Sequence, residues 1–162
     1  MITAGILTIS TSGAAGARED TSGMAIRELV TAPPVEASIS QSAIVPDDRA
    51  AIEGTLCHWA DDLRLNLILT TGGTGLSPTD MTPEATLAVV DRLVPGLAEA
   101  MRAESLRQTP FAMLSRGVAG CRGATLVINL PGSPKGVREC LAVVLPALPH
   151  AIAILTGAVT QH

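Results

Sequence analysis

The segment Thr70–Thr82 combines glycines, hydroxyl groups and a carboxylate in an order that suits anion binding, and its first part reads Thr-Thr-Gly-Gly-Thr-Gly. Glycines turn the backbone tightly and let amides approach an anion with no Cβ in the way. We therefore predict a phosphate-binding loop, with a tight turn that holds no ligand as the alternative. The residues of this loop are Thr71, Gly72, Gly73, Thr74 and Gly75. The loop matches neither the Walker motif nor G-x-G-x-x-G.

Two aspartates are candidates for the charged part of such a site. Asp80 follows the glycine loop closely, and Mg²⁺ at phosphate sites is usually held by one or two carboxylates. We predict that Asp80 is a Mg²⁺ ligand, with a helix cap or a solvated turn as the alternative. Asp47 and Asp48 follow another predicted strand. Because capping of the next helix explains only one of them, we predict that Asp47, which is nearer the strand end, reaches into the site.

Further candidates for anion binding follow the later strands. Ser133 comes after a Pro131-Gly132 turn and begins a helix, where free backbone amides attract anions. Lys135 is the only lysine of the chain, and we predict that it neutralises phosphate oxygens, with an ordinary surface lysine as the alternative. Ser115-Arg116 is predicted to clamp a phosphate, because a guanidinium group binds phosphate through two parallel hydrogen bonds.

The strands that must position these residues are visible as apolar runs. Gly5–Ser10, Asn66–Thr71 and Thr125–Leu130 are apolar on both faces, as expected for inner strands of a parallel sheet covered by helices. Glu36–Val45 alternates between apolar and polar residues and predicts a less buried strand. Ala112–Ser115 is a fifth candidate strand.

Helices are predicted between the strands, from their capping residues and apolar spacing. They run from Asp20, Thr21 or Ser22 to about Val30, from Asp47 or Asp48 to about Leu63, from a Thr82 cap to Pro95, over Gly96–Glu104, and from about Ser133 and Pro146 onward. The alternation predicts one domain, residues 1–162, with a three-layer α/β/α sandwich and a mainly parallel sheet. Val118–Gly123 is predicted to pair with the following strand as a small antiparallel element. In such sheets ligands bind beyond the carboxyl ends of the strands, and every candidate residue ends or follows a predicted strand.

The composition disfavours several classes of partner. The net charge is −4, and the chain has one Trp, one Phe and no Tyr, so it offers little to a nucleic-acid backbone or to stacked bases. No run of about 18 uncharged apolar residues occurs, which predicts no membrane span. The N-terminus lacks the basic region of a signal peptide, so we expect a soluble cytoplasmic protein. The three cysteines are far apart and are predicted to be free thiols.

Four segments together resemble the molybdopterin adenylyltransferase family, which includes bacterial molybdenum-cofactor proteins and the G domain of gephyrin. They are Val45–Asp48, Leu67–Ala85, Leu114–Gly117 and Val127–Lys135. The signature Thr-Gly-Gly-Thr-Gly followed by Asp-x-Thr-Pro-Glu is specific to this family, and the resemblance extends from Leu7 to about Leu155. It implies the molybdopterin-binding fold, and homotrimers are common in the family.

The resemblance also implies an activity. The family transfers AMP from MgATP to the terminal phosphate of molybdopterin and releases pyrophosphate, so ATP and molybdopterin are the implied substrates and Mg²⁺ the implied cofactor. Asp47 and Asp80 match the two aspartates on which that activity depends. Ser115 and Ser133 fall in matching binding segments. Family members usually carry an aspartate after the first strand, whereas this chain has Thr11; the alternative is therefore a non-catalytic molybdopterin-binding paralogue of the same fold.

Overall fold

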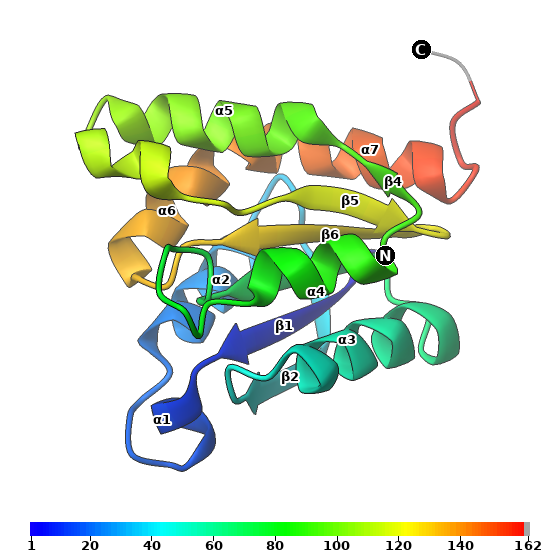
Figure 1. The fold of residues 1–162 in the computed structure, drawn as a ribbon. Coiled ribbons are helices and arrows are strands. Elements are labelled where there is room, and N and C mark those ends of the chain that lie inside the picture. Colours follow the sequence, from blue (N-terminus) through cyan, green and yellow to red (C-terminus); the bar gives the residue numbers. More distant parts are fainter. Residues whose placement is uncertain (161–162) are drawn as a thin grey trace.

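A six-stranded sheet forms the centre of the computed structural model, which describes residues 1–160 (Figure 1). The last two residues of the predicted domain lie outside the described residues. The strands are β1 (Thr3–Ile9), β2 (Ser38–Val45), β3 (Leu67–Thr71), β4 (Arg92–Leu93), β5 (Ala119–Arg122) and β6 (Thr125–Leu130), in the order β2-β1-β3-β6-β5-β4. Strands β2, β1, β3 and β6 are parallel, and β5 is antiparallel to both of its neighbours. The predicted fold class is therefore confirmed.

Helices cover both faces of the sheet. They are α1 (Thr11–Ala14), α2 (Thr21–Thr31), α3 (Arg49–Cys57), the π-helical turn η1 (His58–Asp62), α4 (Thr82–Val89), α5 (Pro95–Leu106), the 3₁₀ turns η2 (Pro110–Leu114) and η3 (Leu145–Ala147), α6 (Pro134–Val144) and α7 (Leu148–Leu155). Side chains of α2, α5, α6 and α7 form one core against the sheet, and side chains of α3, η1 and α4 form the other. The burial of these apolar side chains is the main force that holds the three layers together.

The burial of each strand follows its sequence pattern. Every residue of β3 and β6 is buried, as the continuous apolar runs predict for strands with helices on both faces. Strand β2 lies at the sheet edge, and its residues alternate between exposed and half-buried. The carboxyl ends of the parallel strands β1, β2, β3 and β6 all point toward the same end of the sheet (Figure 1). The loops that carry the predicted site residues therefore meet at that end.

Two predictions of secondary structure are wrong. Ala112–Ser115 is not a strand, because Thr109 caps a 3₁₀ turn that begins at Pro110. The helix that starts at Thr82 does not reach Pro95. It ends at Val89, and Arg92–Leu93 instead pairs with β5. The Asp91 and Val94 amides donate to carbonyls of that strand at 2.7 and 2.8 Å, and this pairing outweighs the helical spacing of the apolar residues.

The predicted caps are mostly confirmed. Asp20 caps α2, Asp48 caps α3 and Ser133 caps α6, each accepting a hydrogen bond from a backbone amide of the first turn. Thr82 is the exception, because the capping position of α4 belongs to Met81, which makes no side-chain capping bond. The Thr82 hydroxyl instead donates a hydrogen bond to the Gly72 carbonyl.

Within residues 1–160, one helical run, Pro134–Leu155, is long and apolar enough to cross a membrane by length and composition alone. It is interrupted by the 3₁₀ turn η3. Its apolar residues, among them Val137, Leu141, Val144, Leu148 and Ile152, belong to the core of the domain. The hydropathy of this run is therefore explained by packing against the sheet.

Candidate functional site

The glycine loop is fixed against the carboxyl end of β1. Gly72 has φ +96°, and a Cβ there would lie 2.4 Å from the Ile9 carbonyl oxygen. Gly73 has φ +69°, and a Cβ there would meet the Thr82 hydroxyl. Both the positive φ values and the close approach exclude larger residues. The loop is therefore a tightly packed turn whose conformation requires these two glycines.

Side-chain hydroxyls hold the same loop to neighbouring segments. The Thr82 hydroxyl donates to the Gly72 carbonyl at 2.8 Å, and the Thr71 hydroxyl donates to the Pro131 carbonyl at 2.5 Å. Thr82 is fully buried. Helix α4 and the β6–α6 connection thus both position the loop, which explains why residue 82 is a threonine although it does not cap the helix.

A Thr82→Val variant is expected to lower the free energy of unfolding by about 1–3 kcal/mol, because it leaves the Gly72 carbonyl without its hydroxyl donor inside the protein. Urea denaturation measures this loss. Thr82→Ser, which keeps the hydroxyl group, is the matched control and should lose less. Equal losses for both variants would show that the methyl group, and not the hydrogen bond, matters at this position.

The loop lies between two cavities. The larger has a volume of about 360 Å³ and is lined by Thr74, Gly75, Ser115, Pro131, Ser133 and Lys135 on the side of the loops. Its inner wall includes Ala98, Met101 and Cys140. The smaller cavity, of about 160 Å³, is lined by Thr71, Gly72 and Gly132 together with Asp20 and Ser22. Nine of the predicted site residues therefore line one cavity or the other, whereas Gly73, Arg116, Asp47 and Asp80 line neither.

Asp47 is oriented by Thr11. The Thr11 amide and hydroxyl donate to Asp47 Oδ2 at 3.2 and 2.9 Å, and the Asp47 amide donates back to the Thr11 hydroxyl at 3.1 Å. Asp48 caps α3 through the Ala51 amide, as predicted for one of the two aspartates, whereas the prediction that Asp47 reaches into the site stays a prediction. The Thr11 hydroxyl, at a position where the resemblance predicts an aspartate, donates a hydrogen bond to Asp47 Oδ2 that an ionised carboxylate could not donate.

Asp80 folds back over the glycine loop. Its Oδ2 accepts a hydrogen bond from the Ser77 amide at 3.1 Å, and a Cβ on Gly75 would lie 3.0 Å from the same oxygen. Asp80 is not the cap of α4. The two aspartates precede α3 and α4, two helices that pack against each other on one face of the sheet (Figure 1). The larger cavity, in contrast, is lined by residues of α5 and α6, among them Met101 and Cys140.

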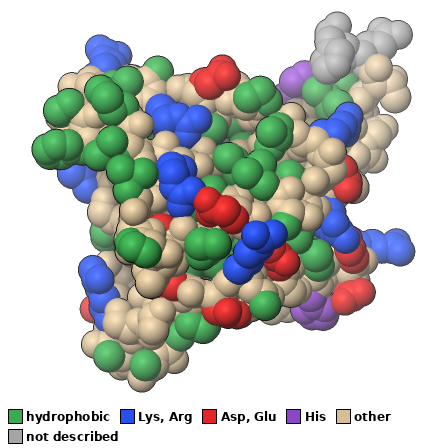
Figure 2. Space-filling view, in the orientation of Figure 1, with side chains coloured by type: hydrophobic (Ala, Val, Ile, Leu, Met, Phe, Trp, Pro, Cys, Tyr) green, Lys and Arg blue, Asp and Glu red, His purple; other side chains and the backbone are tan. Residues whose placement is uncertain are grey.

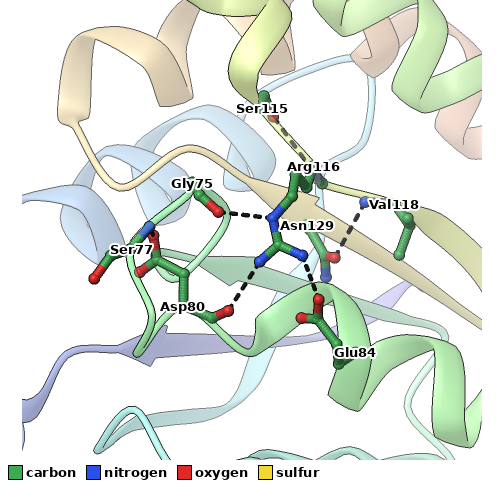
Figure 3. A network of polar contacts seen from close by, with 9 residues as sticks. Gly75, Ser77, Asp80, Glu84, Ser115, Arg116, Val118 and Asn129 are labelled. Carbon is green, nitrogen blue, oxygen red and sulfur yellow. Dashed lines mark hydrogen bonds and ion pairs between the residues drawn. The ribbon is translucent and has the colours of Figure 1, made fainter.

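Arg116 donates to protein partners around the loop (Figure 3). Its Nε donates to the Gly75 carbonyl at 2.7 Å, its Nη2 to the Asp80 carbonyl at 2.9 Å, and its Nη1 forms an ion pair with Glu84. Hydrogen bonding to Arg116 holds the pKa of Glu84 below its usual range. The other carboxylate oxygen of Glu84 is buried and has no hydrogen-bond partner among the described residues. The guanidinium group is thus directed at the loop itself.

The remaining predicted residues keep more exposed positions. Ser133 accepts a hydrogen bond from the Gly136 amide at 3.0 Å as the cap of α6. The Lys135 side chain is 80% exposed, and its Nζ lies 3.7 Å from Glu139. Lys135 lines the larger cavity, and its role in anion binding stays a prediction.

Asn129 is the residue that the sequence interpretation missed. It is buried in β6, donates to the hydroxyls of Thr70 and Thr86 at 3.0 Å each, and accepts from the Val118 amide at 3.2 Å. It also lines the larger cavity. Its signal in the sequence is a single amide within the otherwise apolar end of a predicted inner strand.

The comparisons with known proteins show the family and the fold. The family described as "Probable molybdopterin binding domain" matches residues 5–150. The molybdopterin adenylyltransferase of Helicobacter pylori strain J99 is 42% identical over 94% of this chain and 87% of its own length. That of Escherichia coli K12 is 42% identical over 85% of this chain and 70% of its own length.

Among solved structures, the molybdopterin biosynthesis enzyme MoaB from Thermus thermophilus has a TM-score of 0.91 at 55% identity, covering 97% of this chain and 98% of that one. The Mog protein of Mycobacterium ulcerans has a TM-score of 0.88 at 41% identity, covering 96% and 99%.

Proposed function

This chain belongs to the molybdopterin-binding domain family, and on that premise we propose that it catalyses adenylyl transfer in molybdenum cofactor biosynthesis. The substrates are MgATP and molybdopterin, and the products are adenylated molybdopterin and pyrophosphate. The observation that carries the proposal is the glycine loop, which presents residues to two cavities at once. Relatives named molybdopterin adenylyltransferase at 42% identity support the same activity.

The reaction needs alignment more than a protein nucleophile. The terminal phosphate of molybdopterin attacks the α-phosphorus of ATP, and pyrophosphate leaves; such transfers are accelerated mainly by positioning and charge neutralisation. The larger cavity, with its apolar inner wall, takes the pterin ring, and the smaller polar cavity takes part of the nucleotide. The amides of Gly72–Gly75 then lie where the two phosphates meet.

The charge of the phosphates requires cations. Asp80 would hold Mg²⁺, and Asp47 would hold or order it; a bound Mg²⁺ neutralises phosphate oxygens. No group of three or more His, Cys, Asp or Glu that would cage a metal occurs within residues 1–160. That suits Mg²⁺, which usually binds through one or two carboxylates together with substrate phosphates and water. Lys135 at the cavity mouth supplies a further positive charge.

Pyrophosphate release tests the proposed activity. The purified chain with ATP and Mg²⁺ should release pyrophosphate only when molybdopterin is present, and EDTA should stop the release. Release that does not depend on molybdopterin would identify a different nucleotide-hydrolysing activity.

A Ser105→Phe variant tests the assignment of the larger cavity. Ser105 lines this cavity and its hydroxyl lies 3.4 Å from the Cys140 sulfur. The added ring fills space that the pterin would occupy, so the KM for molybdopterin should rise about ten-fold or more while the KM for ATP is unchanged. Steady-state kinetics measures both constants. Ser105→Ala, which removes the hydroxyl without adding volume, should leave both constants near the wild-type values; a rise in the KM for ATP alone would reverse the assignment.

We also propose that the chain forms a homotrimer and works in the cytoplasm, where ATP and Mg²⁺ are supplied. Large apolar side chains are exposed near the junction of α5 and η2, where Figure 2 shows hydrophobic side chains gathered. They include Leu106, Phe111 and Met113, with Phe111 75% exposed. Contiguous exposed apolar surface typically marks an interface. Analytical ultracentrifugation should give three times the monomer mass, and a monomer mass would overturn this proposal.

A further inference from the structure

Arg116 makes every side-chain hydrogen bond that joins residues 75–80 to another part of the described chain. Within this segment the other bonds are internal. They run from the Ser77 amide to Asp80, from the Asp80 amide to Ser77, from the Thr79 amide to the Ser77 hydroxyl, and between the side chains of Ser77 and Thr79. Leu76 is 65% exposed, and Ser77, Pro78 and Thr79 are exposed as well. The segment that carries Asp80 is therefore an exposed loop, and one guanidinium group makes all of the side-chain hydrogen bonds that tie it to the rest of the fold.

The guanidinium group holds both ends of this loop at once. Nε binds the carbonyl where the loop leaves the glycine turn, at Gly75, and Nη2 binds the carbonyl of Asp80, where α4 is about to begin. The Arg116 amide also donates to the Thr74 carbonyl at 2.8 Å. Because the two carbonyls are held in one plane by a rigid group, the backbone from which the Asp80 carboxylate projects has a defined position.

Arg116 is itself held from two sides, by Glu84 (Figure 3) and by Arg102. Glu84, in the first turn of α4, pairs with Nη1, which leaves Nε and Nη2 directed at the loop carbonyls. Arg102 of α5 donates to the carbonyls of Ser115 and Gly117, the residues on either side of Arg116. The side chains of Arg116 and Glu84 are only about one-third exposed. The contact therefore belongs to a connected network and is not an isolated surface pair.

We infer that Arg116 is a positioning residue that acts through Asp80, and that it does not bind a substrate phosphate. This inference rests on the proposed function, in which Asp80 holds Mg²⁺. It replaces the phosphate-clamp prediction for Arg116, because the guanidinium group lines neither cavity and is used by Gly75, Asp80 and Glu84. Glu84 acts one step further away, by orienting the guanidinium group.

An Arg116→Lys variant tests the inference, because an ammonium group keeps the charge but cannot bind three partners in one plane. The kcat should fall about 10- to 100-fold, as for a misplaced catalytic group. The Mg²⁺ concentration for half-maximal rate should rise about five-fold or more, while the KM for molybdopterin and for ATP stays near the wild-type value. Glu84→Gln should shift the same constants in the same direction by a smaller factor. A raised substrate KM with an unchanged Mg²⁺ requirement would show that Arg116 binds phosphate and would overturn the inference.

Arg122→Lys is the matched control. Arg122 makes a similar fork, with Nε and Nη2 on Asp61 and Nη1 on the Val89 carbonyl, but it pairs with Thr125 at the far end of the sheet. Its variant should lose stability without any change in the Mg²⁺ requirement. An equal change in both variants would show that a general loss of stability is responsible, which would also overturn the inference.

Hydrogen–deuterium exchange separates this inference from the proposed function. In the intact chain without substrates, Arg116→Lys should increase exchange in the peptide that spans residues 74–82, and Arg122→Lys should not. This result is expected even if the protein proves to have no adenylyl transfer activity. Unchanged exchange over residues 74–82 would show that Arg116 does not hold the loop, whatever the activity.

Discussion

An Asp80→Asn variant should lower the kcat of adenylyl transfer about 100- to 1000-fold, as expected when a group that stabilises developing charge is removed. The amide keeps the size of the side chain and can still accept a hydrogen bond from Ser77, the partner of Asp80 Oδ2 in the structure. It removes the negative charge that we propose for Mg²⁺ binding. The backbone carbonyl that Arg116 binds is unchanged, so the loop should keep its conformation. Steady-state rates over a range of Mg²⁺ concentrations measure the effect.

Asp62→Asn is the control for charge. Asp62 is exposed in η1, where it contacts His58, and it lies on neither cavity. Its variant carries the same change in net charge and should retain the wild-type rate. If Asp80→Asn also retains the wild-type rate and Mg²⁺ requirement, Asp80 does not hold the metal, and Asp47 becomes the remaining carboxylate candidate.

Gly72→Ala should abolish most activity and lower the free energy of unfolding by about 3 kcal/mol, the upper end of the cost of a strained backbone position. The added Cβ would lie 2.4 Å from the Ile9 carbonyl oxygen, and the residue has φ +96°. Because the Ile9 oxygen belongs to the backbone and not to a flexible side chain, the backbone must move to relieve this contact. Because the loop lies between both cavities, the displacement should reduce kcat about 100-fold. Thermal or urea denaturation and the adenylylation rate give the two effects separately.

Gly157→Ala is the control that separates the steric clash at Gly72 from the strain of a positive φ, because it introduces the strain without a clash. Gly157 has φ +75°, close to the values in the glycine loop, but no atom lies within 4 Å of the position of its Cβ. This variant should cost about 1 kcal/mol, the penalty for the left-handed conformation alone, and should keep full activity. A Gly72→Ala variant that behaves like Gly157→Ala would mean that β1 yields to the added methyl group.

The parallel part of the sheet could be predicted from the sequence, because apolar runs on both faces leave few alternatives. The runs at β1, β3 and β6, the edge strand β2 and the antiparallel β5 were all placed within a few residues. The missed elements depend on partners distant in the chain. Arg92–Leu93 becomes a strand only because β5 is available for pairing, and its own residues fit a helix equally well.

In the candidate site, too, the features that depend on neighbouring residues could be predicted, and those that depend on distant residues could not. Local signals predict the glycine turn, the capping role of Asp48 and the position of Ser133, since each depends on neighbours within a few residues. The side-chain partners of Arg116 come from the loop of residues 75–80 and from α4, both more than 30 residues away in the sequence. No local pattern shows that an arginine after a 3₁₀ turn is directed at a loop and not at a ligand. The buried contacts of Asn129 are equally remote in sequence.

The most direct test of the proposed function is transfer of label from ATP, labelled at the α-phosphorus, to molybdopterin by the purified chain with Mg²⁺. We predict that label appears in a pterin-containing product in the same amount as released pyrophosphate, and that EDTA prevents its formation. Tight binding of molybdopterin with all of the label left in ATP would contradict the proposal. It would identify the chain instead as a non-catalytic molybdopterin-binding paralogue.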